Sequence, residues 1–289
     1  MSQSDSELNA LIDLLDDDQI YPNVRERLLE HGSSAIPYLR DVVHQKDRAR
    51  ISRATSLLKE IHDREFENEW IEALLDSREK ALDLERMVWL VVRIGYPTVD
   101  VEFYTEKVED LAEHTRSRIR ATDSEIDKVR RLIGVIANTF CYTGNTANYY
   151  EADNSFLNRV LDRKVGIPIS LSVLYLLVAR RVEIPLAGVG IPGHFMLKYV
   201  GHESSDTPFV DPFYAGRMLG RAAVQRFCIR TGAGFRQYYL DPVSDTDIVE
   251  RILRNLVIVY TRDENQKQLH RMHRLLNFYS EYYVKPEDE

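Results

Sequence analysis

The stretch that decides the fold is N-S-F-L-N-R-V-L-D-R-K-V-G-I-P-I-S-L-S-V-L-Y, residues 154–175. It predicts a short helix near residues 155–161 and, after a Gly-Ile-Pro break, a second helix near 169–182. Short β-like runs follow between Pro-Gly and polar turn residues, at 186–189, 195–200 and 209–210. The polar segment G-H-E-S-S-D-T-P, residues 201–208, is expected to form a hairpin. This order predicts helices laid on one small antiparallel sheet, confined to about residues 186–240.

Upstream of this core, apolar residues recur at helical spacing from Leu8 to about Ile61. Tyr21-Pro22 and residues 31–34 interrupt the spacing with helix-stop and N-cap residues, so short helices stacked as hairpins are expected. Residues 35–43, A-I-P-Y-L-R-D-V-V, are similar to part of a HEAT-type repeat. We expect five apolar side chains inside these hairpins: Leu11, Leu28, Leu39, Leu58 and Ile61.

Helical spacing continues on both sides of the core. The stretch M-V-W-L-V-V, residues 87–92, is apolar on every side and is expected to be buried. Residues 248–260 and 266–278 form a pattern similar to one tetratricopeptide repeat. The predicted organisation is HEAT-like helical hairpins at 1–64, a helical bundle packing on the core at 65–143, the core itself at 144–245, and a tetratricopeptide-like helical pair at 246–282.

Composition limits the classes of partner. The chain has 289 residues, a formal net charge of −8 and a pI near 5.6, so it is repelled by nucleic acid and by anionic membranes. Its start, M-S-Q-S-D-S-E, is polar and acidic, and no apolar run reaches the ~18 residues that span a bilayer. We therefore expect a cytoplasmic protein without nucleic-acid or membrane partners.

Cysteine and histidine give no sign of a metal site. The two cysteines, Cys141 and Cys228, form no C-x-x-C pair and lie beside aromatic residues, so both are expected to be buried and structural. His270 and His273 are three residues apart on a predicted helix without an obvious third ligand. The sequence therefore predicts no metal and no cofactor.

Four phrases, in their order and spacing, resemble one known family. They are G-N-T-A-N-Y-Y (144–150), the opening stretch 154–175, G-I-P-G-H-F-M-L (190–197) and F-V-D-P-F (209–213). Together they resemble the transglutaminase-like superfamily, in particular bacterial proteins of the Sir B type, whose core also occurs in some F-box proteins and is commonly followed by tetratricopeptide-like helices. The resemblance implies a mostly helical α+β fold: a transglutaminase-like (papain-like) core of helices on a small antiparallel sheet, flanked by segments similar to helical repeats.

The resemblance also implies where a catalytic site would lie. Active members carry a Cys at the N-terminus of the core helix, a His on the second strand and an Asp on the third, because the helix end stabilises a thiolate and the carboxylate orients the imidazole. His194 and Asp211 match two of these positions. The Cys position falls at Pro168 or within two residues of it, where Ser170 is the only candidate nucleophile. Alternatively, Pro168 occupies the first helical turn and Ser170 bonds locally to backbone.

Two interpretations remain open for the surroundings of the pair. His194 and Asp211 are expected to be neighbours that either line a ligand cleft or are sealed in the core. If the resemblance holds, the cleft would be lined by Asn145, Tyr149, Tyr150, Asn154, Phe195 and Phe213. The Asn-rich and Tyr-rich loop would otherwise satisfy its own backbone.

The sequence supports three hypotheses for function. The first is a non-catalytic protein- or peptide-binding or regulatory module, favoured by the missing cysteine, by the lack of a metal or phosphate motif, and by repeat-like helices at both ends. The second is a hydrolase or acyl transferase that uses Ser170, His194 and Asp211. The third is a helical scaffold whose core is similar in architecture alone.

Overall fold

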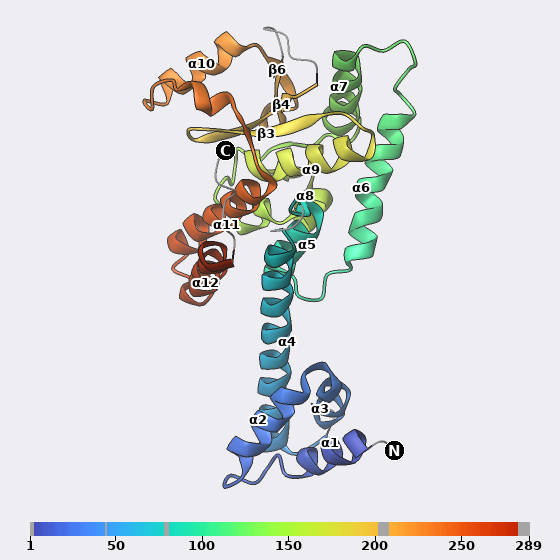
Figure 1. Ribbon diagram of the computed structural model, residues 1–289, viewed down its shortest axis with the longest axis vertical. Coiled ribbons are helices and arrows are strands. Elements are labelled where there is room, and N and C mark those ends of the chain that lie inside the picture. The colour runs from blue at the N-terminus through green and yellow to red at the C-terminus, as the bar shows by residue number, and fades with distance from the viewer. Residues whose placement is uncertain (1–2, 44, 78–80, 202–207, 283–289) are drawn as a thin grey trace. The chain divides into compact units, whose positions relative to one another are not determined.

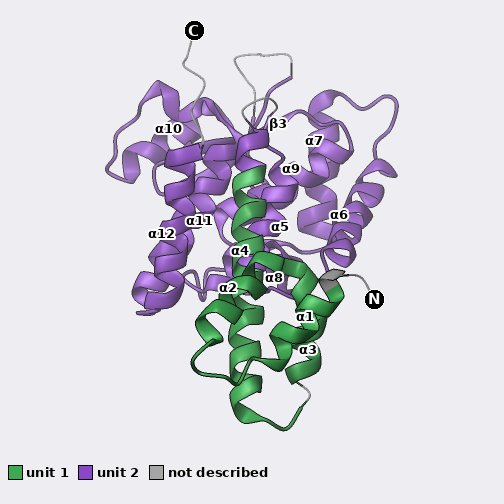
Figure 2. Ribbon diagram, turned by 60° about the horizontal axis from the view of Figure 1, so that its bottom comes forward, with its two compact units in different colours: residues 1–72 green, residues 73–289 purple. Residues whose placement is uncertain are grey.

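The computed structural model describes residues 3–43, 45–77, 81–201 and 208–282, and most of them are helical (Figure 1). Two compact units make up the chain, residues 1–72 and 73–289 (Figure 2). Each unit has its own core. The finer division into four segments stays a prediction.

Unit 1 is built from short helices that begin and end where the sequence predicts breaks. Pro22 lies in the first turn of its helix, where a missing N–H leaves no bond unmade, and Gly32 ends that helix with a φ of 54° that suits glycine. The elements are α1 (Gln3–Asp13), α2 (Tyr21–His31), the 3₁₀ turn η1 (Gly32–Ala35), α3 (Ile36–Val43) and α4 (Arg48–Asp76).

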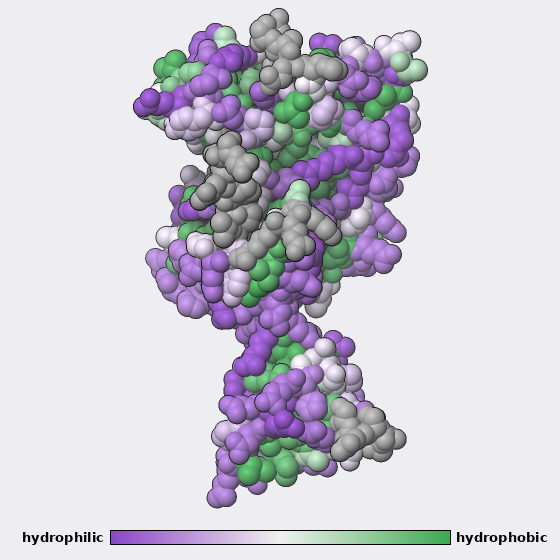
Figure 3. Space-filling view, in the orientation of Figure 1, coloured by the Kyte–Doolittle hydropathy of each residue, from purple (hydrophilic) through white to green (hydrophobic). Residues whose placement is uncertain are grey.

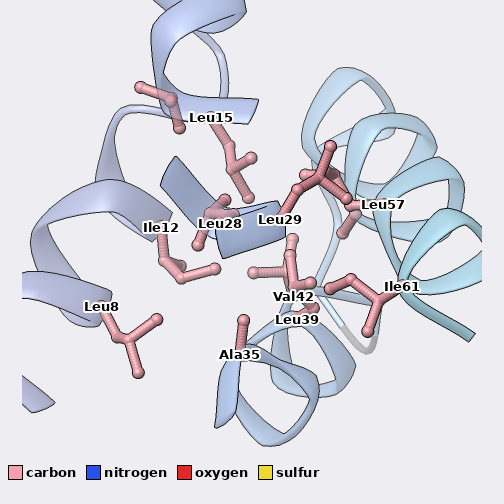
Figure 4. Close-up of a cluster of buried hydrophobic side chains, with 12 residues drawn as sticks. Leu8, Ile12, Leu15, Leu28, Leu29, Ala35, Leu39, Val42, Leu57 and Ile61 are labelled. Atoms are coloured by element: carbon pink, nitrogen blue, oxygen red, sulfur yellow. The ribbon is translucent and has the colours of Figure 1, made fainter. Parts of the chain in front are cut away.

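Figure 4 shows the core of unit 1, in which apolar side chains from these helices point toward one another. Leu28, Leu39 and Ile61 are buried, which confirms their predicted place inside the hairpins. Leu11 and Leu58 are partly buried and pack against the same cluster. The likeness to a HEAT-type repeat stays a prediction.

Helix α4 runs through the predicted boundary between the segments 1–64 and 65–143. It is continuous over 29 residues. The segment H-D-R-E-F-E-N-E (62–69) contains no Gly or Pro, and three of its eight residues are Glu, which favours helix. Nothing in this segment therefore interrupts the helix.

Unit 2 holds the core helices and the sheet. Four of its helices have an N-cap side chain that accepts a hydrogen bond from a backbone N–H of the first turn. These N-cap residues are Asp83, Asp100, Ser124 and Ser244. The helices are α5 (Leu84–Gly95), α6 (Val101–Arg116), α7 (Glu125–Ile133), α8 (Leu157–Arg163), α9 (Pro168–Arg181), α10 (Arg221–Arg230), α11 (Asp245–Arg262) and α12 (Gln266–Tyr282). Shorter turns are the π-helix η2 (Gly134–Thr139) and the 3₁₀ turns η3 (Ala152–Ser155), η4 (Pro212–Tyr214) and η5 (Gln237–Leu240).

The sheet of unit 2 has five antiparallel strands in the order β6-β5-β4-β3-β7. They are β3 (Leu186–Ile191), β4 (His194–Tyr199), β5 (Phe209–Asp211), β6 (Arg217–Leu219) and β7 (Pro242–Val243). Figure 1 shows this sheet between α10 on one side and α9 on the other. The mostly helical α+β fold with a small antiparallel sheet is thereby confirmed.

Three details of the core were not predicted. Strand β7 lies just beyond the expected limit at residue 240. A separate pair of two-residue strands, β1 (Thr143–Gly144) and β2 (Val165–Gly166), is parallel. Helix α7 continues as a π-helix from Gly134. Residues 202–207 of the expected polar hairpin lie outside the described residues.

Hydrophilic residues cover much of the face seen in Figure 3, with hydrophobic side chains interspersed among them. None of the described helices combines the length and the apolar character needed to cross a membrane.

Candidate functional site

The start of helix α9 is the position where the superfamily would carry its nucleophile. Pro168 is the first helical residue, and Ile167 is the N-cap. The Ser170 hydroxyl accepts the Ile167 N–H at 3.1 Å and donates to the Asn154 carbonyl at 2.5 Å. Because this hydroxyl accepts from one backbone N–H and donates to one backbone carbonyl, it links the start of α9 to the preceding loop. This is the geometry of the local-bonding interpretation of Ser170.

The loop before α8 is held by two buried asparagines, and we call their bonds, together with those of Ser170, the loop network. The Asn145 amide donates to the Asn154 side-chain oxygen at 2.9 Å and accepts the Asn148 N–H at 3.0 Å. The Asn154 amide donates to the carbonyls of Asn148 at 2.6 Å and Tyr149 at 3.1 Å. Both amide protons of the Asn154 side chain are therefore donated within the loop, and its oxygen accepts one further bond there.

His194 and Asp211 are brought together by adjacent antiparallel strands. His194 begins β4 and Asp211 ends β5, and the imidazole Nε2 donates to a carboxylate oxygen at 2.9 Å. The bond that the sequence predicted between these residues is present. In the neutral ring, donation from Nε2 leaves the lone pair on Nδ1, so Nδ1 is the nitrogen able to accept a proton.

Aromatic side chains surround the imidazole. Ring centroids of Phe213, Tyr214 and Phe227 lie 6.0, 6.1 and 5.3 Å from that of His194. His194 is 6% exposed, whereas half of Tyr214 is exposed. The aromatic rings therefore nearly seal the imidazole, while presenting a surface of their own.

The second carboxylate oxygen of Asp211 has no hydrogen-bond partner in the described part of the chain, although the carboxylate is fully buried. The Arg217 guanidinium lies 3.6 Å from it, beyond hydrogen-bonding distance. The Tyr175 hydroxyl on α9 is also buried without a partner there. Burial raises the pKa of Tyr175, and the charge of Asp211 raises it further, which places the hydroxyl within electrostatic reach of the pair.

Close packing joins the pair to the loop. The Phe213 ring lies so near Gly144 that a Cβ added there would come within 2.5 Å of it. The ring of Tyr149 lies 5.9 Å from that of Phe213, and burial raises the pKa of its hydroxyl. Tyr150 is about half exposed, and Phe195 is buried. A cleft lined by these residues together with Asn145 and Asn154 stays a prediction.

The cysteines differ from each other. Cys228 is buried, as predicted, and burial raises the pKa of its thiol. The prediction for Cys141 was wrong, because this side chain is exposed at the end of the π-helix, where its backbone adopts a φ of 63°. Within the described ranges, no group of three His, Cys, Asp or Glu side chains could hold a metal ion.

Sequence reasoning missed Tyr175, Tyr214 and Arg217 beside the pair. Tyr175 belongs to the uniformly apolar run of α9, and nothing in that run marks it as the neighbour of a carboxylate. Tyr214 and Arg217 follow the motif F-V-D-P-F by only a few residues, so the turn after the third strand was the one available signal.

The fold and the His–Asp pair define a transglutaminase-like protein, and comparison with known proteins agrees. The family profile described as "Transglutaminase-like superfamily" matches residues 102–254. UPF0162 proteins from two strains of Xylella fastidiosa are 34% and 33% identical over 189 and 193 residues. These matches cover 63% and 64% of this chain and 66% and 68% of those proteins. The chain thus spans about two thirds of the length of these relatives.

Shorter matches reach other proteins. F-box only protein 21 of Mus musculus is 40% identical over 91 residues, 29% of this chain and 14% of that protein. Protein SirB1 of Salmonella typhimurium is 25% identical over 123 residues, 43% of this chain and 44% of that protein. No solved structure matches. The chain belongs to the transglutaminase-like superfamily, as the motifs had indicated, and within it to the UPF0162 proteins.

Proposed function

We propose that this protein is a non-catalytic transglutaminase-like module that binds another protein or a peptide. The proposal rests on one observation, which is that His194 could act as a base but has no nucleophile beside it among the described residues. The proton-accepting nitrogen of His194, Nδ1, has no thiol or hydroxyl bonded to it among the described residues. Acyl transfer requires such a group within hydrogen-bond reach of the base.

The start of α9 supports the same interpretation. Pro168 offers no reactive atom, and Ser170 lies in the loop network, with its proton directed to a backbone carbonyl. A hydroxyl held in this way would have to break a bond of 2.5 Å before His194 could activate it. The Ser170–His194–Asp211 hydrolase is therefore the weaker hypothesis.

Binding is supported by the surface that covers the imidazole. Tyr214 is half exposed, and it stacks edge-on against Phe213 at 5.2 Å. Aromatic side chains that are rigidly held and partly exposed are common anchors in protein interfaces. The fold keeps them in place through the His–Asp pair beneath.

The binding test is selection of phage-displayed random dodecapeptides on the full chain. We expect enrichment of peptides whose affinity falls about tenfold in Tyr214→Ala. Phe103→Ala is a matched control, since Phe103 is 48% exposed on α6, and it should leave the affinity unchanged. Failure to enrich any peptide, or equal losses in both variants, would contradict the proposal.

The catalytic test is labelling with a fluorophosphonate together with an assay of amine incorporation into glutamine peptides. We expect neither labelling of Ser170 nor incorporation. Stoichiometric labelling of Ser170 that disappears in His194→Ala would overturn the non-catalytic proposal in favour of a serine hydrolase.

Restoring the missing group tests the inherited geometry. In a Cys141→Ser background, which removes the exposed thiol, Pro168→Cys should place a thiol at the N-terminus of α9. The helix dipole should lower its pKa below the ordinary value, so it should react with iodoacetamide faster at pH 7 than Cys141 does in the wild type. A slower reaction would mean that α9 does not present this position as the superfamily does.

A further inference from the structure

One face of helix α11 carries charge that the described chain does not neutralise. Arg251, Asn255, Ile258 and Arg262 are spaced by four, three and four residues, which places them on one side of a helix. We call these four residues the arginine stripe. At 1.5 Å per residue its two arginines are about 16 Å apart along the helix axis. Ile258, between them, is 48% exposed.

Arg251 is half-buried and has no carboxylate partner in the part of the chain that the structure describes. One of its terminal nitrogens donates to the backbone carbonyls of His194 at 2.8 Å and Ile191 at 3.3 Å. Its guanidinium carbon lies 5.3 Å from the centre of the Phe195 ring. Burial lowers the pKa of this guanidinium, as expected for a cation without a nearby anion.

Arg262, three turns further along, is exposed, and among the described residues it likewise pairs with no carboxylate. Its guanidinium carbon lies 4.0 Å above the Tyr150 ring, which holds the side chain against the loop. Tyr150 in turn packs on Tyr149 with ring centroids 5.1 Å apart. Both arginines are thus held in position by aromatic rings.

The contrast with the rest of α11 is clear. Arg254 on the same helix pairs with Glu250 at 2.5 Å. Other surface arginines, such as Arg27 and Arg130, also pair with nearby acidic side chains. In a chain with a net charge of −8, two arginines that pair with no carboxylate of the described residues form a local basic surface. An exposed apolar side chain lies between them, so the complementary partner is acidic and carries an apolar residue.

We propose that the arginine stripe, with Tyr149 and Tyr150 at its side, binds an acidic segment of a partner protein, in which carboxylates about 16 Å apart flank an apolar residue. This inference rests on the proposed binding function and specifies the partner. The arginine stripe lies next to His194, because Arg251 donates a hydrogen bond to the backbone carbonyl of His194.

The test uses the same random dodecapeptide library on the full chain, followed by fluorescence anisotropy of the enriched peptides. We expect enrichment of Asp and Glu over the input library, and binding that weakens as NaCl is raised from 50 to 300 mM. Arg262→Ala should weaken the peptides about fivefold. Arg254→Ala, on the same helix, is the matched control and should leave their affinity unchanged.

The outcomes separate the two proposals. Enriched peptides that are neutral or basic, or that bind Arg262→Ala and Arg254→Ala alike, would overturn the acidic partner and leave the binding function intact. Absence of any enriched peptide would overturn the binding function itself. Tighter binding of fluorescein-labelled single-stranded dT12 than of the peptides would overturn the proposal by assigning the stripe to nucleic acid.

Discussion

Two clusters of buried polar side chains lie within unit 2, and they differ in how completely their hydrogen bonds are made. In the loop network, the Asn154 amide makes three bonds and the Ser170 hydroxyl is bonded on both sides. Beside the His194–Asp211 bond, one carboxylate oxygen and the Tyr175 hydroxyl have no hydrogen-bond partner among the described residues. Both clusters are equally removed from solvent.

The difference separates two reasons for burying polar groups. A buried network whose bonds are all made fixes one conformation, whereas each unpartnered buried atom reduces stability by its lost hydration. The loop network therefore acts as structural support for the start of α9. The surroundings of the His–Asp pair, by contrast, leave one carboxylate oxygen without a hydrogen bond from the described residues.

The largest expected effect concerns the loop network. Asn154→Ala removes three hydrogen bonds and leaves two carbonyls and one amide unpaired in a buried loop, so we expect a loss of about 3 kcal/mol or more in the free energy of unfolding. Urea-induced unfolding followed by circular dichroism measures it. Asn148→Ala is the control, because it lies in the same loop and its exposed side chain makes no such bonds. Equal effects in the two variants would remove the distinction between the clusters.

A smaller loss is expected at the pair. Asp211→Ala leaves the imidazole of His194 without its acceptor, which should lower the free energy of unfolding by about 1–3 kcal/mol. The loss of stability is partly offset, because the substitution also removes the carboxylate oxygen that has no hydrogen-bond partner among the described residues. An unchanged urea midpoint would argue that the 2.9 Å bond contributes nothing to stability.

The smallest effect should have the opposite sign. Tyr175→Phe removes a buried hydroxyl without a partner, so at pH 7 the free energy of unfolding should stay within about 0.5 kcal/mol of wild type or rise slightly. Its pKa is raised in the folded state, so above pH ~10 the unfolded chain loses this proton first and wild-type stability falls as pH rises. The Phe variant should lose less stability between pH 9 and pH 11.

Tyr150→Phe, at an exposed position, is the control for that pH series and should follow the wild type. A loss of more than about 1 kcal/mol in Tyr175→Phe at pH 7 would mean that the hydroxyl is bonded after all, for example through a buried water.

Much of this arrangement was predictable from the sequence because motif order and apolar spacing carry it. The helix at 169–182 and the strands after it follow from short local patterns, whereas the pairing of His194 with Asp211 was implied by the family resemblance. The parallel pair β1–β2 was not predictable, since two-residue strands have no periodicity. Neither the neighbours of Asp211 nor the bonding of Arg251 to the carbonyls of Ile191 and His194 leaves a sequence signal, because both depend on contacts between distant segments.

The contact between Gly144 and Phe213 restricts which substitutions are possible at these two positions. Any side chain at position 144 would meet the Phe213 ring at 2.5 Å, so substitution there requires a smaller residue at 213 in the same step or beforehand. Phe213 also lies against His194 and Tyr149, so a smaller residue at 213 would loosen both. A glycine with no chemistry of its own thus limits which side chains can stand at position 213, and a change at either position requires a change at the other.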